Sequence, residues 1–489
     1  MQQYILLMFN GNREGRRSFL LPLLFMLAMQ TSCKKLVNVR PPVFATTSAS
    51  VYNSDATAAA VLTGVYAKLS STSNYAGARG FTTISLFAGL SADEFTLFDL
   101  TNSNYRAYYT NNLSINSGGY EYWSPIYSYI FTCNSAIEGI SNSSSLTPAV
   151  KQQLFGEAKF LRAFFYFYLI NMYGDAPLVL SSDFKVNASL PRIPKAQIFQ
   201  QIIADLKDAQ NLLTSGYVDG TLLIKTGERT RPNKWSATAL LARVYLYVGD
   251  WTNAETLASL VINNSALYSL ATLNNVFLMN SNEAIWQLQP VNTNITNTQD
   301  ARQFIIPATG PGSGWPVYLS NNLLNSFEAG DLRRTNWVDS ISITGTTYYY
   351  PYKYKVNIPR AQLKEYLMIL RLGEQYLIRA EARAQQGNIA AGAADLDSIR
   401  TRAGLTYTTA ATKQDLLSAI LHERQVELFT ELGQRWFDLK RTQAIDAVMS
   451  LVTPQKGGGT WNSYQQLYPI YAADLQKDIN LTQNPGYQK

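Results

Sequence analysis

The sequence predicts a mostly α-helical protein in which helix pairs form a scaffold that carries long loop-rich insertions and minor β hairpins. Three observations support this prediction. A helix-turn-helix spacing occurs twice, a third segment is apolar on almost every face of a helix, and the intervening segments are rich in Asn, Thr, Ser, Gly and Tyr. Because such helix pairs bury their apolar faces only by stacking on neighbours, we expect one domain.

The first 32 residues have the layout of a secretory signal. Three arginines precede an apolar run at 18–29, which is far shorter than the roughly 20 residues that span a bilayer. Cys33 follows the run and resembles the lipidated cysteine of bacterial lipoproteins. We therefore expect cleavage before Cys33 and a lipid anchor on its thiol. The alternative is an ordinary secretory signal whose Cys33 pairs with Cys133.

The long segments 70–120, 290–316, 339–359 and 453–469 are polar and aromatic, and we expect them to be loops with a function. Short alternating stretches at 284–289 and 341–348 predict minor strands or hairpins.

The segment 156–174 is apolar almost all round and predicts a central helix covered on every side. Thr147 and Pro148 mark the start of a helix that leads into it.

The first helix pair spans 233–262, with a break at Gly249 and Asp250 and a capping box from Thr252 to Glu255. The same spacing of small residues returns at 380–399, where Asn388 is the expected cap. This spacing is typical of tetratricopeptide repeats, in which small residues let two antiparallel helices approach closely.

The composition excludes several classes of function. A net charge of +7 without a run of Lys or Arg does not favour nucleic acid. The only histidine, His422, cannot build a multi-histidine metal site, and the chain has no nucleophile elbow or phosphate-binding glycine loop. We therefore expect no cofactor, no metal and no catalytic activity.

Charged residues on the last predicted helices form pairs at helical spacing. Glu423, Arg424 and Glu427 lie on one face, and Arg435 and Asp438 are three residues apart, so we expect ion pairs between helices. Paired carboxylates also serve as acid and base in glycoside hydrolysis, but a packed helix offers no cleft for substrate. Asp93 and Glu94 are followed by a loop and are the alternative candidates for a polar functional site. Their structural interpretation is a helix cap or a turn.

Five segments, taken together, resemble one known family. They include Glu157-Ala-Lys-Phe-Leu-Arg-Ala163 and the run from Glu423 to Arg441, and they lie at 32–42, 123–134, 157–177, 423–441 and 467–487. Their order and spacing are similar to those of the SusD/RagB family of outer-membrane nutrient-binding lipoproteins of Bacteroidetes.

The resemblance implies a SusD-like fold, attachment to the outer membrane facing the cell exterior, and association with a SusC-type TonB-dependent transporter. It also implies capture of an oligosaccharide or, in some members, a peptide. The expected organisation is a signal at 1–32 and one domain at 33–489. The helical scaffold lies mainly in 50–70, 123–262 and 360–445, and the loop-rich ligand face mainly in 70–122, 263–359 and 446–489.

A sugar presents apolar C–H faces and a rim of hydroxyls, so its site needs aromatic platforms edged by amide and guanidinium groups. The loops supply this mixture, and the candidate ligand-binding residues are Tyr75, Arg79, Asn102, Asn104, Tyr105, Arg106, Tyr108, Tyr109, Trp315 and Tyr318, with a further tyrosine run at 348–350. A peptide-binding protein in the same location, a hydrolase using Asp93 or Glu94, and a pure protein-interaction scaffold are the alternatives.

Overall fold

The computed structural model describes residues 48–70, 81–291 and 297–487. The predictions for the signal, Cys33, Tyr75 and Arg79 lie outside the described residues. The chain divides into two units, Met1–Ser50 and Val51–Lys489, and the description below concerns the second.

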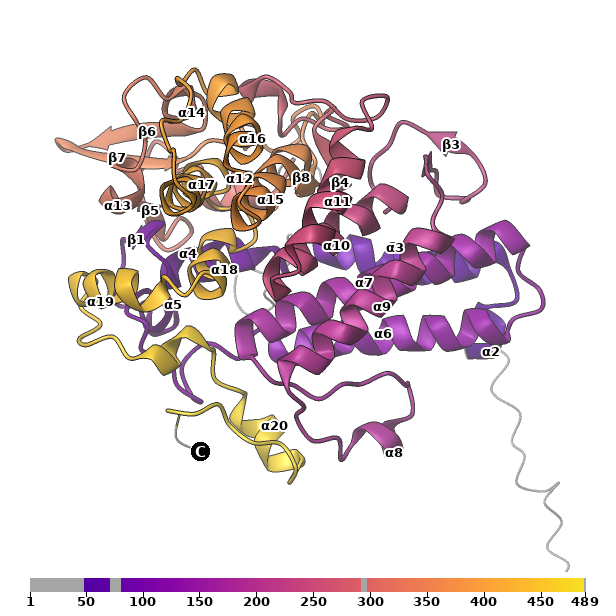
Figure 1. Cartoon of the computed structure of the whole chain (residues 1–489). Helices are drawn as coiled ribbons and strands as arrows, with labels where there is room; N and C mark the ends of the chain where they lie inside the picture. Colours follow the sequence, from indigo (N-terminus) through magenta and orange to yellow (C-terminus); the bar gives the residue numbers. More distant parts are fainter. Residues whose placement is uncertain (1–47, 71–80, 292–296, 488–489) are drawn as a thin grey trace, which may run out of the picture. The chain divides into compact units, whose positions relative to one another are not determined.

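The prediction of a mostly α-helical protein is confirmed (Figure 1). In chain order the α-helices are α2 Ser48–Val51, α3 Asp55–Ser70, α4 Ile84–Ser91, α5 Ser103–Tyr109, α6 Trp123–Asn142, α7 Pro148–Tyr173, α8 Phe184–Asn187, α9 Lys195–Leu212, α10 Lys234–Val248, α11 Trp251–Ile262, α12 Gln299–Phe304, α13 Asn321–Leu324, α14 Leu332–Asn336, α15 Leu372–Gln385, α16 Ile389–Arg402, α17 Lys413–Glu427, α18 Gln434–Arg441, α19 Ile445–Gln455 and α20 Ala472–Lys477. Short 3₁₀ helices are η2 Phe81–Thr83, η3 Leu273–Asn275 and η4 Ser463–Gln466.

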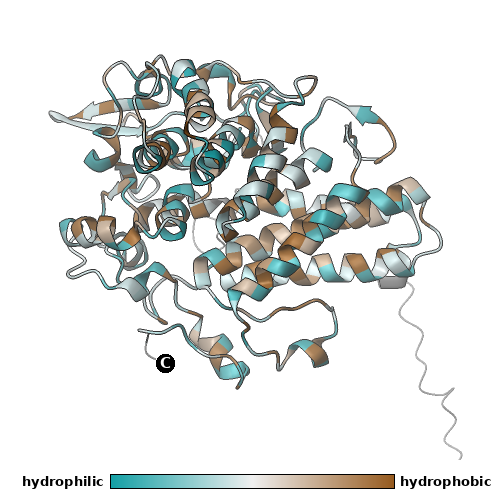
Figure 2. Ribbon diagram, in the orientation of Figure 1, coloured by the Kyte–Doolittle hydropathy of each residue, from teal (hydrophilic) through white to brown (hydrophobic). Residues whose placement is uncertain are grey.

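Helix α7 is the central helix that the sequence predicts. It contacts α3, α6, α9 and α10, and α6, α7 and α9 run side by side (Figure 1). Most of its 26 residues are buried, and apolar residues recur along these long helices (Figure 2). The helix that leads into Gly156 is the same continuous helix, which begins at Pro148 without a side-chain capping bond from Thr147. Within the described part of the chain, no helix combines the length and apolarity needed to cross a membrane.

Both predicted helix pairs are confirmed. The first is α10 with α11, and the second is α15 with α16, begun by the predicted cap Asn388. Gly249 ends α10 at φ +79°, a conformation that glycine adopts without strain. The predicted capping box at Thr252 is wrong, because the Asp250 side chain accepts the N–H of Asn253 and begins α11 earlier. Helix α11 packs against α15, so the two pairs stack although they lie far apart in sequence.

Strands are few and short, and in the described chain they form antiparallel pairs. The pairs are β1 Phe95–Leu97 with β5 Val317–Leu319, β2 Tyr217–Val218 with β3 Lys225–Thr226, β4 Ala284–Leu288 with β8 Leu367–Arg371, and β6 Val338–Ile343 with β7 Thr346–Pro351. The prediction of a strand at 284–289 and of a hairpin beginning near 341 is confirmed. The hairpin turns at Thr344 and Gly345, both at positive φ.

The paired charges on the last helices join elements across the core, as the sequence predicts. Arg424 bonds Asp438 at 2.7 Å, linking α17 to α18. Glu423 pairs with Arg333 of α14 at 2.6 Å, and Glu427 pairs with Arg371 of β8 at 2.6 Å. All these side chains are almost completely buried, so their role in the structure is to hold helices and strands together.

Candidate functional site

Three aromatic side chains from distant parts of the chain meet at the protein surface. The Tyr348 ring centroid lies 5.2 Å from that of Tyr318 and 5.9 Å from that of Phe98, with interplanar angles of 77° and 80°. Phe98 is 44% exposed and the two tyrosines are half-buried. We call Phe98, Tyr318 and Tyr348 the aromatic surface. Each ring is held by its neighbours and keeps part of its area accessible to a ligand.

Strand pairing explains how these rings come together. In the β1–β5 pair Thr96 lies opposite Tyr318, and the Phe98 N–H donates to the Pro316 carbonyl at 2.8 Å. Because alternate residues of a strand share a face, Phe98, Thr96 and Tyr318 lie on the same side of this pair. Strand β7 packs against β5 and adds Tyr348 from the hairpin.

The Tyr318 hydroxyl stays protonated at neutral pH. Burial raises its pKa, the nearby Tyr348 adds to the rise, and a hydrogen bond with Thr96 opposes it. Tyr109, beneath this strand pair, also bonds Thr96. A protonated phenol both donates and accepts hydrogen bonds, which suits a partner bearing hydroxyl groups.

The predicted tyrosine cluster at 102–109 is a helix, α5, instead of a loop. Tyr105, Tyr108 and Tyr109 lie three and four residues apart, so they share the inner face of α5. Tyr105 packs on Phe87, and Tyr108 is fully buried, with its hydroxyl accepting the Gly119 N–H at 2.8 Å. Tyr108 and Tyr109 therefore support the fold beneath the surface, whereas Tyr105 is half-buried and remains partly exposed.

The polar residues of the same cluster are more exposed to solvent than Tyr108 and Tyr109. Asn102 is exposed and caps α5 by accepting the Tyr105 N–H at 3.1 Å. Arg106 is exposed and Asn104 is half-buried. Since α5 contacts β1, Asn102 and Arg106 are candidates for polar contacts beside the aromatic surface.

Trp315 is half-buried in a turn before β5. Its indole N–H donates to the Arg302 carbonyl at 2.9 Å, and its backbone is bridged to Gly312. The predicted glycine-rich loop therefore orients Trp315 and leads directly into Tyr318. Its ring offers a smaller accessible area than an exposed side chain would.

Phe98 is the member of the aromatic surface that the sequence reasoning missed. It directly follows β1 and precedes a turn that contains Asp99, Thr101 and Asn102. A large apolar side chain next to a polar turn is the signal that could have identified it.

Asp93 and Glu94 have the structural role. Both are buried, and Asp93 pairs with Arg435 at 2.6 Å, so the guanidinium holds the Asp93 pKa below its usual value despite burial. Glu94 accepts the Thr430 N–H at 3.0 Å. Burial raises the Glu94 pKa to about 7, and the neighbouring Asp93 carboxylate contributes. Among the described residues, both carboxyl groups are buried and bonded to groups of the core, which favours the structural interpretation.

The raised Glu94 pKa predicts a pH-dependent loss of stability. A carboxyl group with a higher pKa in the folded state stabilises the fold at low pH, and this contribution is lost as pH rises toward the folded-state pKa of about 7. Glu94→Gln keeps the acceptor for Thr430 but cannot ionise. Urea unfolding should therefore show the variant gaining stability relative to the natural chain between about pH 5 and about pH 8. Parallel stability profiles of the two proteins would contradict the assignment.

Metal chemistry finds no support among the described residues, where no group of three or more His, Cys, Asp or Glu could hold an ion. His422 instead contacts the Ser326 carbonyl through Nε2 at 2.8 Å. Cys133 is buried on α6, and burial raises its thiol pKa well above the usual value.

Two family models match separate parts of the chain. Residues 44–246 match a model described as starch-binding associating with outer membrane, and residues 333–487 match the model of the SusD family. SusD-like protein P2 of Formosa agariphila is 28% identical over 425 residues, which cover 75% of this chain and 80% of the relative. Starch-binding protein SusD of Bacteroides thetaiotaomicron is 34% identical over 131 residues, 24% of this chain and 21% of the relative.

Solved structures share the fold. A laminarin-binding SusD-like protein superposes with a TM-score of 0.70 at 23% identity, covering 88% of this chain and 99% of the other. Surface glycan-binding protein A from Bacteroides uniformis superposes with a TM-score of 0.73 at 20% identity, covering 87% and 98%. None of the matches described here names a catalytic activity.

Proposed function

This chain belongs to the SusD family, and from that membership we propose that it captures oligosaccharides at the outer membrane without cleaving them. In this proposal a lipid on Cys33 holds the protein at the membrane, facing the cell exterior. The bound sugar passes to a SusC-type TonB-dependent transporter. Support comes from the relatives named for starch, laminarin and glycan binding.

The aromatic surface is the observation that carries the proposal. Sugar rings stack their C–H faces on aromatic rings, and here the Tyr348 ring lies within 6 Å of both Tyr318 and Phe98, nearly perpendicular to each. The tyrosine hydroxyls, with exposed Asn102 and Arg106 at helix α5, which contacts β1, supply groups for the sugar hydroxyls.

Removing the aromatic surface should weaken glycan binding. We expect the double variant Phe98→Ala/Tyr348→Ala to lose about 2 kcal/mol of binding free energy, roughly 30-fold in Kd, because central aromatic contacts dominate binding energies. Isothermal titration with starch and laminarin oligosaccharides measures this loss.

Tyr407→Ala is the matched control, since Tyr407 is 69% exposed and has no part in the aromatic surface. Unchanged affinity in the double variant would move the site elsewhere. Binding of a peptide mixture, with no binding across a glycan array, would replace the sugar by a peptide as the ligand. Cleaved oligosaccharide after long incubation, seen by mass spectrometry, would replace capture by hydrolysis.

The anchor is tested at Cys33. We expect Cys33→Ala to move the protein from the membrane fraction into the soluble fraction, because the acyl chains supply the membrane affinity. Mass spectrometry of the N-terminal peptide should find a diacylglyceryl group on Cys33 of the natural protein. An unmodified thiol there would contradict anchoring, and failure to co-purify with an outer-membrane barrel would contradict the transporter partnership.

A further inference from the structure

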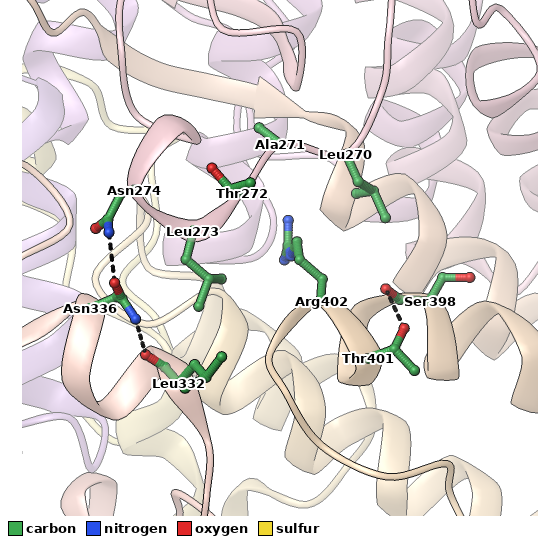
Figure 3. Close-up of a pocket in the computed structure, with 10 residues that line it drawn as sticks. All are labelled: Leu270, Ala271, Thr272, Leu273, Asn274, Leu332, Asn336, Ser398, Thr401 and Arg402. Carbon is green, nitrogen blue, oxygen red and sulfur yellow. Dashed lines mark hydrogen bonds between the residues drawn. The ribbon is translucent and has the colours of Figure 1, made fainter.

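A concave site lies apart from the aromatic surface. It is a cavity of about 620 Å³ between the segment 270–274, helix α14 and the last turn of α16 (Figure 3). This volume falls within the range of roughly 300–1,000 Å³ that ligand sites occupy. The cavity borders α14, which ends at Asn336 just before strand β6 begins. The aromatic surface lies farther along β6, where Ile341 pairs with Tyr348. From Asn336 to Ile341 the chain covers roughly 17 Å if extended, so one ligand group does not fill both sites.

Arg402 occupies the centre of the residues that line the cavity (Figure 3). Its side chain is 8% exposed, and one Nη donates to Glu283 at 2.7 Å while the other pairs with Glu427. The Nε–H is buried and has no acceptor among the described residues. A buried donor without an acceptor is unfavourable, so an oxygen of a ligand bound here would stabilise the site.

The charges around Arg402 favour a neutral ligand. Both of its carboxylate partners are shared: Glu283 also pairs with Arg371 at 2.9 Å, and Glu427 pairs with Arg371 at 2.6 Å and with Arg333 at 2.9 Å. Counted with the further partners of Arg371 and Arg333, the connected network of described residues holds five cations and six carboxylates, so the positive charge of Arg402 is compensated. An anion in the cavity would meet these carboxylates behind the guanidinium, whereas a neutral oxygen would not be repelled.

The other lining groups complement hydroxyls. The hydroxyl protons of Ser398 and Thr401 are donated to the carbonyls of Ala394 and Asp397, at 3.0 and 2.7 Å, which leaves their oxygens able to accept. Arg402 donates and these two oxygens accept, so the matching ligand group both accepts and donates. A hydroxyl does both, but a carboxylate only accepts. Leu273 and Leu332 add an apolar wall for the C–H face of a ring.

We propose that this cavity is a second sugar subsite that binds a neutral pyranose unit through Arg402, Ser398 and Thr401. The inference rests on the proposed function and extends it, because a glycan with two contact regions is held more firmly than one held at the aromatic surface alone.

The test follows the leucine methyl groups of the protein by NMR during titration with the neutral probes maltotriose and laminaritriose. Signals of Leu273 and Leu332, assigned by substitution, should shift in the natural protein and in Phe98→Ala/Tyr348→Ala. They should stay fixed in Ser398→Phe, whose ring fills the cavity. Ala394→Phe is the control, because Ala394 is exposed one turn earlier on α16 and lies outside the cavity.

A further variant separates the role of Arg402 from a loss of structure. Arg402→Lys keeps the charge beside Glu283 and Glu427 but removes the Nε–H, and we expect at least a tenfold weaker leucine response with an unchanged circular dichroism spectrum. Leucine signals that do not move, while oligosaccharides still bind the aromatic surface by calorimetry, overturn the subsite and leave the proposed function standing. Absence of oligosaccharide binding at both places overturns both. Shifts produced by glucuronate or triglycine, but not by the neutral sugars, overturn the ligand class.

Discussion

Replacing Arg371 by methionine should lower the free energy of unfolding by about 3–5 kcal/mol, because it leaves buried carboxylates without their cation. Arg371 is 1% exposed and bonds Glu283, Glu427 and Glu431 at 2.6–2.9 Å. Arg371 thus joins the end of β8 to Glu283 just before β4, to Glu427 at the end of α17 and to Glu431 in the segment that follows α17. Methionine fills much of the same volume, so the loss reports on charge and hydrogen bonding more than on packing. Urea unfolding followed by circular dichroism measures the change.

The matched control for this prediction is Arg360→Met, which removes an exposed arginine. We expect its unfolding free energy to stay within about 0.5 kcal/mol of the natural value, as is usual at the surface. If Arg371→Met and Arg360→Met lower the free energy of unfolding by the same small amount, the buried ion-pair network contributes little to stability.

Replacing Trp286 by alanine should destabilise the protein by about 3–5 kcal/mol, because a large core side chain is lost and a cavity remains. Trp286 is fully buried on β4, and its ring lies 5.0 Å from Phe160 and 5.3 Å from Phe164 of α7. Its indole N–H donates to the Thr230 carbonyl at 3.1 Å. The residue therefore joins the central helix to the strand pair, and thermal and urea unfolding should both show the loss.

Two comparisons make the Trp286 prediction specific. Trp286→Phe keeps most of the apolar volume and loses the indole hydrogen bond. Its loss of unfolding free energy should therefore be smaller than that of Trp286→Ala. Trp251→Ala removes a half-buried tryptophan at the start of α11 and should cost less than Trp286→Ala. If Trp251→Ala and Trp286→Ala lose the same unfolding free energy, the contact between α7 and β4 does not stabilise the protein more than a half-buried tryptophan does.

The helices could be predicted because their signals are local. The apolar residues of α7 and the small residues of the two helix pairs recur at helical period, and Gly249 and Asn388 mark ends by their own backbone and side-chain chemistry. The start of α11 was misassigned because two neighbouring residues, Asp250 and Thr252, can both cap a helix. Local sequence does not distinguish which of them accepts the bond.

The residues of the candidate site are less predictable from the sequence than the helices are. Tyr105, Tyr108 and Tyr109 have the composition of a binding loop, but they lie on a helix that buries Tyr108 and Tyr109 and half-buries Tyr105. Tyr318 and Tyr348 meet only because β5 and β7 pack together, and Phe98 joins them through its pairing opposite Pro316. Arg402 belongs to the charged network beside a cavity that no motif indicates.

The sequence by itself determined the class of fold, the stacking helix pairs, the family and the pairing of charges between the last helices, because periodicity, caps and motif spacing are properties of neighbouring residues. The tertiary structure alone decided which of the many aromatic and charged side chains remain accessible. Exposure depends on which distant segments cover a residue, and the same tyrosine stabilises the core on one face of a helix or contacts a ligand on the other.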